Sequence, residues 1–178
     1  KDNGLYENTI IIFAGDNGLA VGQHGLMGKQ NVYEHSVGVP LMIKAAAQHT
    51  GKKTADLCYL IDVFPTLCDM LQLPVPQSVD GISLLSSLDG KEPVRDYLYY
   101  SYMDNQRGIS DGTWKLIEYH VNGKRTTQLF NLKNDPWERN DLSGQKKYEK
   151  TIQRLREKMA EEQKRTNDTS VFWNNFSY

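Results

Sequence analysis

The most constraining feature of this sequence is a pair of apolar runs that flank a glycine-rich loop. Residues 9–13 read TIIIF and residues 39–44 read VPLMIK. The first run is apolar on both faces and rich in β-branched side chains, which is typical of a strand buried in a parallel sheet. The second run predicts another buried strand. The loop between them, residues 14–31, begins with Ala-Gly and continues with the tripeptide Asp-Asn-Gly. The chain is therefore predicted to be α/β.

Two helices are predicted from apolar side chains at spacings of three and four. The first covers residues 56–72, where Asp62 is positioned to cap the main part of the helix. Pro65 then falls in the first turn, where a missing N–H does no harm. The second covers residues 146–165, among many lysine, arginine and glutamate residues. Its narrow apolar stripe consists of Tyr148, Ile152, Leu155 and Met159.

A small antiparallel sheet is predicted between these helices. Strand-like runs are joined by turns at Asp111-Gly112 and Asn122-Gly123, and Asn-Gly between two such runs is a strong hairpin signal. The preceding stretch is rich in proline and glycine and holds one short helical turn, SLLSSL. The predicted organisation is residues 1–73 as the last portion of an α/β domain, 74–95 as a connector, and 96–178 as a C-terminal subdomain.

The composition excludes several classes of protein. The net charge of -1 provides no basic surface for nucleic acid. No apolar run approaches the roughly 20 residues of a membrane span. Cys58 and Cys68 lie ten residues apart on one predicted helix, about 15 Å from each other, so both are expected to be buried and free. The polar start without Met suggests a piece cut from a longer protein.

Asp16 and Asn17 are candidate metal ligands. In open α/β sheets, ligands bind beyond the carboxyl ends of the strands, which is where this pair follows. Carboxylate and amide oxygens are hard ligands that suit Ca²⁺ or Mg²⁺. Two side chains cannot supply the six to eight oxygens that Ca²⁺ requires, so other ligands must come from elsewhere. The alternative interpretation of the tripeptide is a plain turn.

Lys29 and His24 lie further along the same loop. Lys29 is a point-charge donor suited to an anionic oxygen, and His24 could donate a hydrogen bond or protonate a leaving group. The alternatives are a solvated lysine and a histidine that stabilises the loop. His35 is expected to be structural, and His49 and His120 to lie at the surface. A cation site beside an anion-binding loop suits cleavage of a phosphate or sulfate ester.

The residues from 9 to 43 carry a family resemblance. The segment TIIIFAGDNGLAVGQHGLMGKQNVYEHSVGVPLMI closely resembles the type I sulfatases of the alkaline-phosphatase superfamily. Looser matches follow at LIDVFPTLCDML, VDGISLLSSLDG, GISDGTWKLI and LFNLKNDPWERNDL. The resemblance implies the C-terminal part of an alkaline-phosphatase-like parallel or mixed sheet sandwiched by helices. A small antiparallel sheet with a C-terminal helix would complete the chain.

The resemblance also implies roles for the loop residues. Asp16 and Asn17 would ligate Ca²⁺, Lys29 would hold a sulfate oxygen, and His24 would line the substrate pocket. Gly38 stands where the family often has arginine. The family nucleophile is a formylglycine made from Cys or Ser in the pattern Cys/Ser-x-Pro/Ala-x-Arg, and neither cysteine of this chain fits that pattern. The nucleophile and the other metal ligands are therefore expected in an N-terminal part of the same protein, and this chain alone is expected to be inactive.

Other functions stay open on the sequence. One alternative is a phosphonate or phosphate ester hydrolase of the same superfamily, which more often has Asp-His where this chain has Asp16-Asn17. Another is a non-catalytic binding module. The resemblance favours sulfated carbohydrates over small aryl esters, and a parent that is periplasmic, secreted or lysosomal. Two residue pairs, Gln106-Arg107 and Tyr119-His120, are candidates either for the substrate pocket or for the surface.

The two apolar strands also predict how the chain behaves in solution. They are expected to be central strands of a sheet whose other strands belong to the N-terminal part. Their apolar faces would then be open. The chain is therefore expected to dimerise, to aggregate, or to fold stably only with that N-terminal part.

Overall fold

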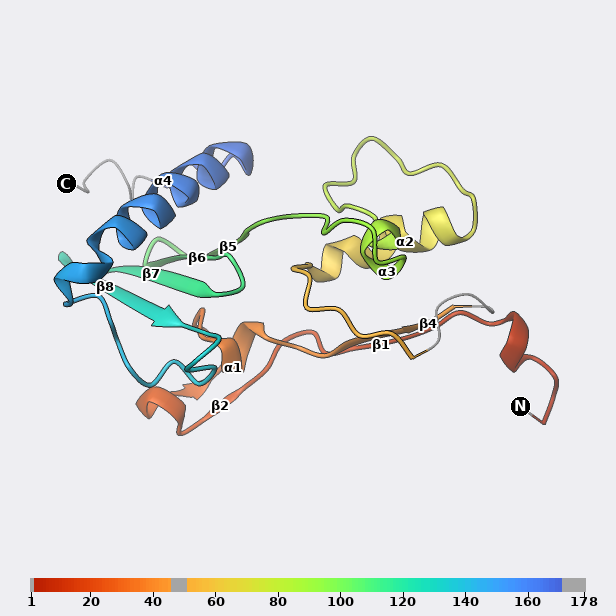
Figure 1. Ribbon diagram of the computed structural model, residues 1–178, viewed down its shortest axis with the longest axis horizontal. Coiled ribbons are helices and arrows are strands. Elements are labelled where there is room, and N and C mark those ends of the chain that lie inside the picture. Colours follow the sequence, from red (N-terminus) through yellow and green to blue (C-terminus); the bar gives the residue numbers. More distant parts are fainter. Residues whose placement is uncertain (1, 46–50, 171–178) are drawn as a thin grey trace. The chain divides into compact units, whose positions relative to one another are not determined.

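A computed structural model describes residues 2–45 and 51–170 (Figure 1). The chain divides into two compact units: residues 1–16 with 39–96, and residues 17–38 with 97–178. The sequence placed residues 17–38 with the α/β portion, whereas they pack with the C-terminal residues. The domain boundaries proposed from the sequence stay a prediction for the whole protein.

The first unit contains the two apolar strands as an antiparallel pair. β1 (Ile11–Ala14) pairs with β4 (Leu41–Lys44), with Ile11 opposite Lys44 and Ala14 opposite Leu41 (Figure 1). The first run is typical of a strand in a parallel sheet, whereas its observed neighbour is antiparallel, as the mixed sheet left open by the sequence allows. An apolar run fits a buried strand of either direction, and here the chain returns beside its own outgoing strand.

The apolar side chains of this pair are largely exposed. Phe13 and Met42 are directly opposite each other, with 57% and 59% of their surface exposed. The burial predicted for both strands is therefore not provided by the residues that the structure describes. Open apolar faces are what the sequence predicted for strands that lack their neighbours.

The helices of the first unit are shorter than predicted. In place of one helix over residues 56–72, a 3₁₀ turn η3 (Leu60–Asp62) leads into α2 (Val63–Met70). The short helical turn predicted after residue 82 is α3 (Leu85–Leu88). An N-terminal 3₁₀ turn, η1 (Tyr6–Asn8), precedes the strands. Both cysteines are free, and Cys68 is buried as predicted. Cys58, which was also expected to be buried, is half-buried and lies before the helix.

Asp62 lies at the junction between η3 and α2 and ties several segments together. Its side chain does not cap α2, contrary to the prediction, but is fully buried. It accepts hydrogen bonds from the backbone N–H groups of Tyr59, at 2.7 Å, and Ile82, at 2.9 Å. It also forms an ion pair with Arg95, whose Nη2 lies 2.9 Å from Oδ1. A buried carboxylate needs such partners, and they hold three segments of the first unit together.

The second unit is built on a four-stranded antiparallel sheet in the order β5-β6-β7-β8. Asn122 and Gly123 have φ angles of 52° and 73°, as the two-residue turn between β7 and β8 requires. The predicted sheet and its last hairpin are therefore confirmed. The strands are β5 (Leu98–Tyr102), β6 (Gln106–Ser110), β7 (Trp114–Val121) and β8 (Lys124–Asn131).

The predicted last helix is confirmed as well. A 3₁₀ turn, η4 (Lys146–Tyr148), runs into α4 (Glu149–Arg165). Tyr148 packs against the edge of the cluster that the other stripe residues help to form. Among the described residues, no helix is long and apolar enough to cross a membrane.

Both faces of this sheet are covered (Figure 1). Neighbouring residues of one strand point to opposite faces, so Leu116 packs with α4 while Ile117 packs with residues of the 17–38 segment. On the α4 side the core is formed by Tyr99, Ile109, Leu116, Leu129, Ile152, Leu155 and Met159. On the other side it is formed by Ile117, Phe130, Val32 and Tyr33.

The 17–38 segment folds into four short elements. β2 (Ala20–Val21) and β3 (Met27–Gly28) form a small antiparallel pair, with the 3₁₀ turn η2 (Gln23–Gly25) between them. α1 (Glu34–Val37) follows. This segment carries three of the four candidate site residues and is laid on the sheet of the second unit.

Candidate functional site

Asp16 and Asn17 follow the end of β1, where the sequence placed them. Asp16 is exposed and Asn17 is half-buried. The strand end just before them is held by a backbone hydrogen bond of 3.2 Å from Gly15 N–H to the Pro40 carbonyl. The two residues are adjacent in the sequence just after a strand, and their oxygens are of the kind that hard cations prefer.

Gly18 fixes the start of the loop by close backbone approach. Its N–H donates to the Ser36 carbonyl at 2.9 Å. A Cβ at this position would lie 2.0 Å from the carbonyl oxygen of His35, a distance that no side chain can occupy. Glycine is needed here for contact with α1, because the loop and the helical turn share one backbone interface.

His24 lies at the exposed tip of the loop in a left-handed conformation, with φ of 54°. Its ring stacks on Tyr33 with centroids 4.0 Å apart and planes inclined by 6°. Its Nε2 lies 3.2 Å from the carbonyl oxygen of Trp137, an acceptor, so Nε2 carries the proton in that contact. Neutral His24 then has Nδ1 as its acceptor. The loop-stabilising role considered from the sequence is thus present.

Lys29 follows β3 and is exposed. Its carbonyl accepts a 2.9 Å hydrogen bond from Asn31 N–H, and its own N–H donates to the Gln30 side chain at 3.2 Å. The backbone around this lysine is therefore tied down on both sides. Its ammonium group stays in contact with solvent, where it can meet an anionic oxygen.

His35 is a half-buried neighbour of this loop, in line with the structural role predicted for it. Its ring centroid lies 5.6 Å from that of His24 and 5.7 Å from that of Tyr33. Burial lowers the pKa of His35, and the charges of His24 and Lys115 lower it further. These effects favour the neutral form of the His35 ring, which suits its packing beside Tyr33.

Buried ion pairs that no sequence pattern predicted hold this loop on the sheet. Lys115 of β7 is fully buried, and its Nζ lies 2.8 Å from Glu34 Oε1 and 3.0 Å from Glu138 Oε1. Glu138 Oε2 also accepts a 2.6 Å hydrogen bond from the backbone N–H of Glu34. Burial raises the pKa of Glu138, although Lys115 opposes that rise. A lysine inside an apolar strand was the available signal, but its partners are distant in sequence.

Tyr33 adds a polar contact to the same attachment. Its hydroxyl donates to Gln128 Oε1 at 2.7 Å, and its ring meets Phe130 edge-on. Tyr33 and Glu34 therefore anchor the loop to β7 and β8, and Tyr33 also supports the ring of His24.

The two further pairs of candidate residues lie on neighbouring strands, β6 and β7. Arg107, considered for the pocket or the surface, is instead buried and paired with Asp168 at 2.8 Å. Gln106, Tyr119 and His120 are half-buried. His49 lies outside the described residues.

The described residues do not by themselves provide a complete set of metal ligands. In the ranges 2–45 and 51–170, no group of three or more histidine, cysteine or acidic side chains could hold a metal ion. Asp16 and Asn17 fit a hard cation by the chemistry of their oxygens, as part of a larger ligand set.

The described architecture is part of an alkaline-phosphatase-like fold, in which a strand followed by polar residues precedes a helix-backed antiparallel sheet. Solved structures described as sulfatases share it, so the predicted fold class is confirmed. The chain belongs to the family of the N-sulphoglucosamine sulphohydrolase C-terminal region, whose model matches residues 22–165.

Curated relatives agree with this family. An N-acetylglucosamine-6-O-sulfatase of Bacteroides thetaiotaomicron is 30% identical over 93% of this chain and 32% of its own length. Arylsulfatase K of Homo sapiens is 27% identical over 74% of this chain and 27% of its own length. The chain thus spans about a third of the length of the curated relatives it matches.

Solved structures were matched as well. One, a protein in complex with its substrate D-glucosamine-2-N,6-O-disulfate, has a TM-score of 0.79 and 28% identity over 97% of this chain and 37% of its own. A phosphonate monoester hydrolase of Agrobacterium radiobacter has a TM-score of 0.76 and 24% identity over 90% of this chain and 36% of its own. The latter likeness shows a shared fold alone.

Proposed function

We propose that this chain is the C-terminal part of a sulfatase that hydrolyses sulfate esters of carbohydrates. The observation that carries the proposal is the family match over residues 22–165, which includes His24 and Lys29 on one anchored loop. Relatives named as sulfatases support the reaction. The glucosamine disulfate bound by a similar solved structure supports a sulfated sugar as the substrate class.

Asp16 and Asn17 are proposed as ligands of Ca²⁺, with Mg²⁺ as the other hard cation that their oxygens suit. Such an ion would stabilise negative charge on the sulfate oxygens. The remaining ligands, and a formylglycine nucleophile, are proposed to belong to an N-terminal part of the same protein. That protein is proposed to be exported to the periplasm, the outside of the cell, or the lysosome.

Lys29 is proposed to hold a sulfate oxygen, and His24 to line the pocket. The exposed ammonium of Lys29 offers three donors to an oxygen that becomes more negative as the ester bond breaks. His24 donates its Nε2 proton to the carbonyl oxygen of Trp137, so the neutral ring can only accept a hydrogen bond at Nδ1. Protonation of a leaving oxygen by His24 would therefore require the doubly protonated ring.

Lys29→Ala tests this proposal in the full protein. Sulfate released from a sulfated glucosamine is measured by ion chromatography. We expect kcat to fall about a hundredfold or more, because a charged donor to the developing anion is lost. Lys133→Ala, which removes another exposed lysine of the same unit, is the control and should stay within about twofold.

Each other result has a defined meaning. Full activity of Lys29→Ala would remove Lys29 from the sulfate site. Turnover of a phosphonate monoester without turnover of any sulfate ester would replace the sulfatase by a phosphonate hydrolase of the same fold. Saccharide binding without turnover of either ester would indicate a non-catalytic binding module.

A further inference from the structure

Trp137 is an aromatic side chain that the proposed function does not use. It lies in the turn-rich segment after β8, and 66% of its surface is exposed. Its neighbour Glu138 is almost completely buried. Indole rings are large and mostly buried in folded proteins. An exposed indole whose neighbouring residue is buried and fixed is therefore a candidate binding surface.

The backbone beneath Trp137 is rigidly held. Glu138 adopts a left-handed conformation with φ of 55°, which is unfavourable for a residue with a side chain. The conformation is fixed by the ion pair of Glu138 with Lys115 at 3.0 Å and by the 2.6 Å hydrogen bond from Glu34 N–H. The Glu138 N–H also donates to the Asp135 carbonyl at 3.1 Å. The backbone that carries the Trp137 ring is therefore already ordered, so binding a ligand costs little further conformational entropy there.

Trp137 also adjoins the candidate site. Its carbonyl accepts the hydrogen bond from His24 Nε2 at 3.2 Å, so the two residues are in direct contact. The His24 loop continues through β3 to the exposed ammonium of Lys29, and Arg139, two residues after Trp137, is exposed as well. An exposed indole and two exposed cationic side chains are thus carried by the two segments that meet at the His24–Trp137 hydrogen bond.

That combination matches the chemistry of a sulfated sugar. A pyranose ring presents an apolar face of C–H groups that packs on an indole, while its sulfate groups need cations. A protein partner could also bind an exposed indole. A protein-binding role would not require the contact between Trp137 and His24, whereas a substrate-binding role does. We propose that Trp137 is a stacking platform for a pyranose ring of the substrate and determines specificity for saccharides. This inference rests on the proposed function.

Trp137→Ala and Trp137→Phe test the platform in the full protein. For a sulfated disaccharide, Trp137→Ala is expected to lower kcat/KM about tenfold or more, because a large aromatic contact is lost. Trp137→Phe should recover most of the loss. The inhibition constant of inorganic sulfate, which occupies only the anion site, should change less than about twofold. Met103→Ala, at an exposed position of the β5–β6 turn, should leave both values unchanged.

Binding gives a second readout that needs no turnover. The intrinsic fluorescence of the full protein is titrated with the same disaccharide, and Trp137→Phe identifies the contribution of Trp137. A saccharide-dependent change that disappears in Trp137→Phe supports the platform. Failure of Trp137-dependent emission to respond to acrylamide would show that the ring is covered by protein, and would overturn the inference.

Failures of the two proposals are distinguishable. If the unmodified protein hydrolyses no sulfate ester, the proposed function fails whatever the variants do. If the unmodified protein hydrolyses the disaccharide and Trp137→Ala does so equally well, the platform alone is wrong.

Discussion

Lys115 holds the loop of residues 17–38 on the sheet of the second unit. Its ammonium is fully buried between Glu34 and Glu138, which approach it at 2.8 Å and 3.0 Å. Removing charges from water is costly, so removal of one partner leaves the others buried without compensation. Lys115 is therefore a positioning residue for His24 and Lys29, which lie on the loop that it holds.

Lys115→Met should lower the free energy of unfolding by about 3–5 kcal/mol, because two carboxylates lose their cation while similar volume is kept. Urea denaturation of the chain measures the loss. Lys124→Met, at an exposed position of β8, is the matched control and should change stability by less than about 0.5 kcal/mol. A loss below about 1 kcal/mol for Lys115→Met would contradict the anchoring role.

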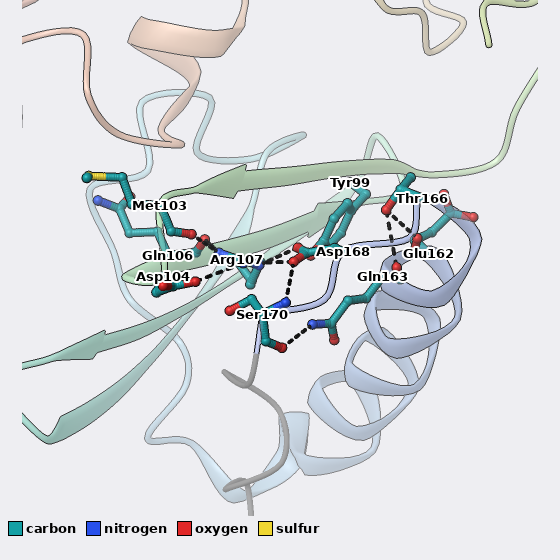
Figure 2. Close-up of polar contacts among 10 residues, drawn as sticks. All are labelled: Tyr99, Met103, Asp104, Gln106, Arg107, Glu162, Gln163, Thr166, Asp168 and Ser170. Atoms are coloured by element: carbon teal, nitrogen blue, oxygen red, sulfur yellow. Dashed lines mark hydrogen bonds and ion pairs between the residues drawn. The ribbon is translucent and has the colours of Figure 1, made fainter. Parts of the chain in front are cut away.

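At the scale of elements, the residues after α4 are fastened to β5 and β6 (Figure 2). Asp168 accepts hydrogen bonds from Arg107 Nε at 2.8 Å, Arg107 Nη2 at 3.1 Å and the Tyr99 hydroxyl at 2.7 Å. Burial acts to raise the pKa of Asp168, but the hydrogen bonds from Arg107 and Tyr99 outweigh it and lower the pKa below its usual value. The carboxylate thus stabilises the fold in its charged form.

This shift predicts a pH dependence of stability. A carboxyl whose pKa is lower in the folded chain contributes fully above the unfolded pKa of about 3.9, and the contribution is lost as pH falls through the folded pKa. Asp168→Asn should remove that part of the acid-side decline. It should also cost about 3 kcal/mol near neutral pH, because buried Arg107 loses its charge partner.

Urea denaturation from about pH 7 down to about pH 2 measures both effects. Asp104→Asn is the control. The Asp104 side chain is 83% exposed, and its Oδ1 lies 4.0 Å from Nη2 of the same arginine, which is too far for a hydrogen bond. The free energy of unfolding of Asp104→Asn should match that of the unmodified chain over the whole pH range. Parallel profiles for Asp168→Asn and the unmodified chain would show that Asp168 carries no such linkage.

At the scale of the whole molecule, the β1–β4 pair leaves apolar side chains of the first unit exposed. Ile11 joins Phe13 and Met42 among the exposed apolar side chains of these strands. Exposed strands with apolar side chains pair readily with other chains. The chain by itself is therefore expected to self-associate through this pair.

Sedimentation velocity of the chain tests the expectation. The unmodified chain should form dimers or larger species, and the double variant Phe13→Ser with Met42→Ser should shift the distribution toward monomer. The reason is that two facing apolar side chains are lost from one cross-strand pair. Val121→Ser, at an exposed site of the second unit, should leave the distribution unchanged. A monomeric unmodified chain at high concentration would refute the expectation.

The parts that sequence patterns predicted well are those governed by local rules. Asn122-Gly123 marked the hairpin because only residues that tolerate positive φ form that turn. The α4 stripe was recognised because one helical face must be apolar to pack on a sheet. Asp16 and Asn17 were found because strand ends are where ligand-binding loops begin. Their roles toward a metal stay predictions.

The sequence by itself determined the local elements of the second unit, the order of the candidate site residues, and the family to which they belong. Only the tertiary structure decided the antiparallel pairing of β1 with β4, the use of Asp62 as a buried tie, and the attachment of the 17–38 loop through Lys115. The physical reason is the range of the interactions. Turn and helix preferences act between near neighbours, whereas Lys115 meets Glu34 across 81 positions of the chain.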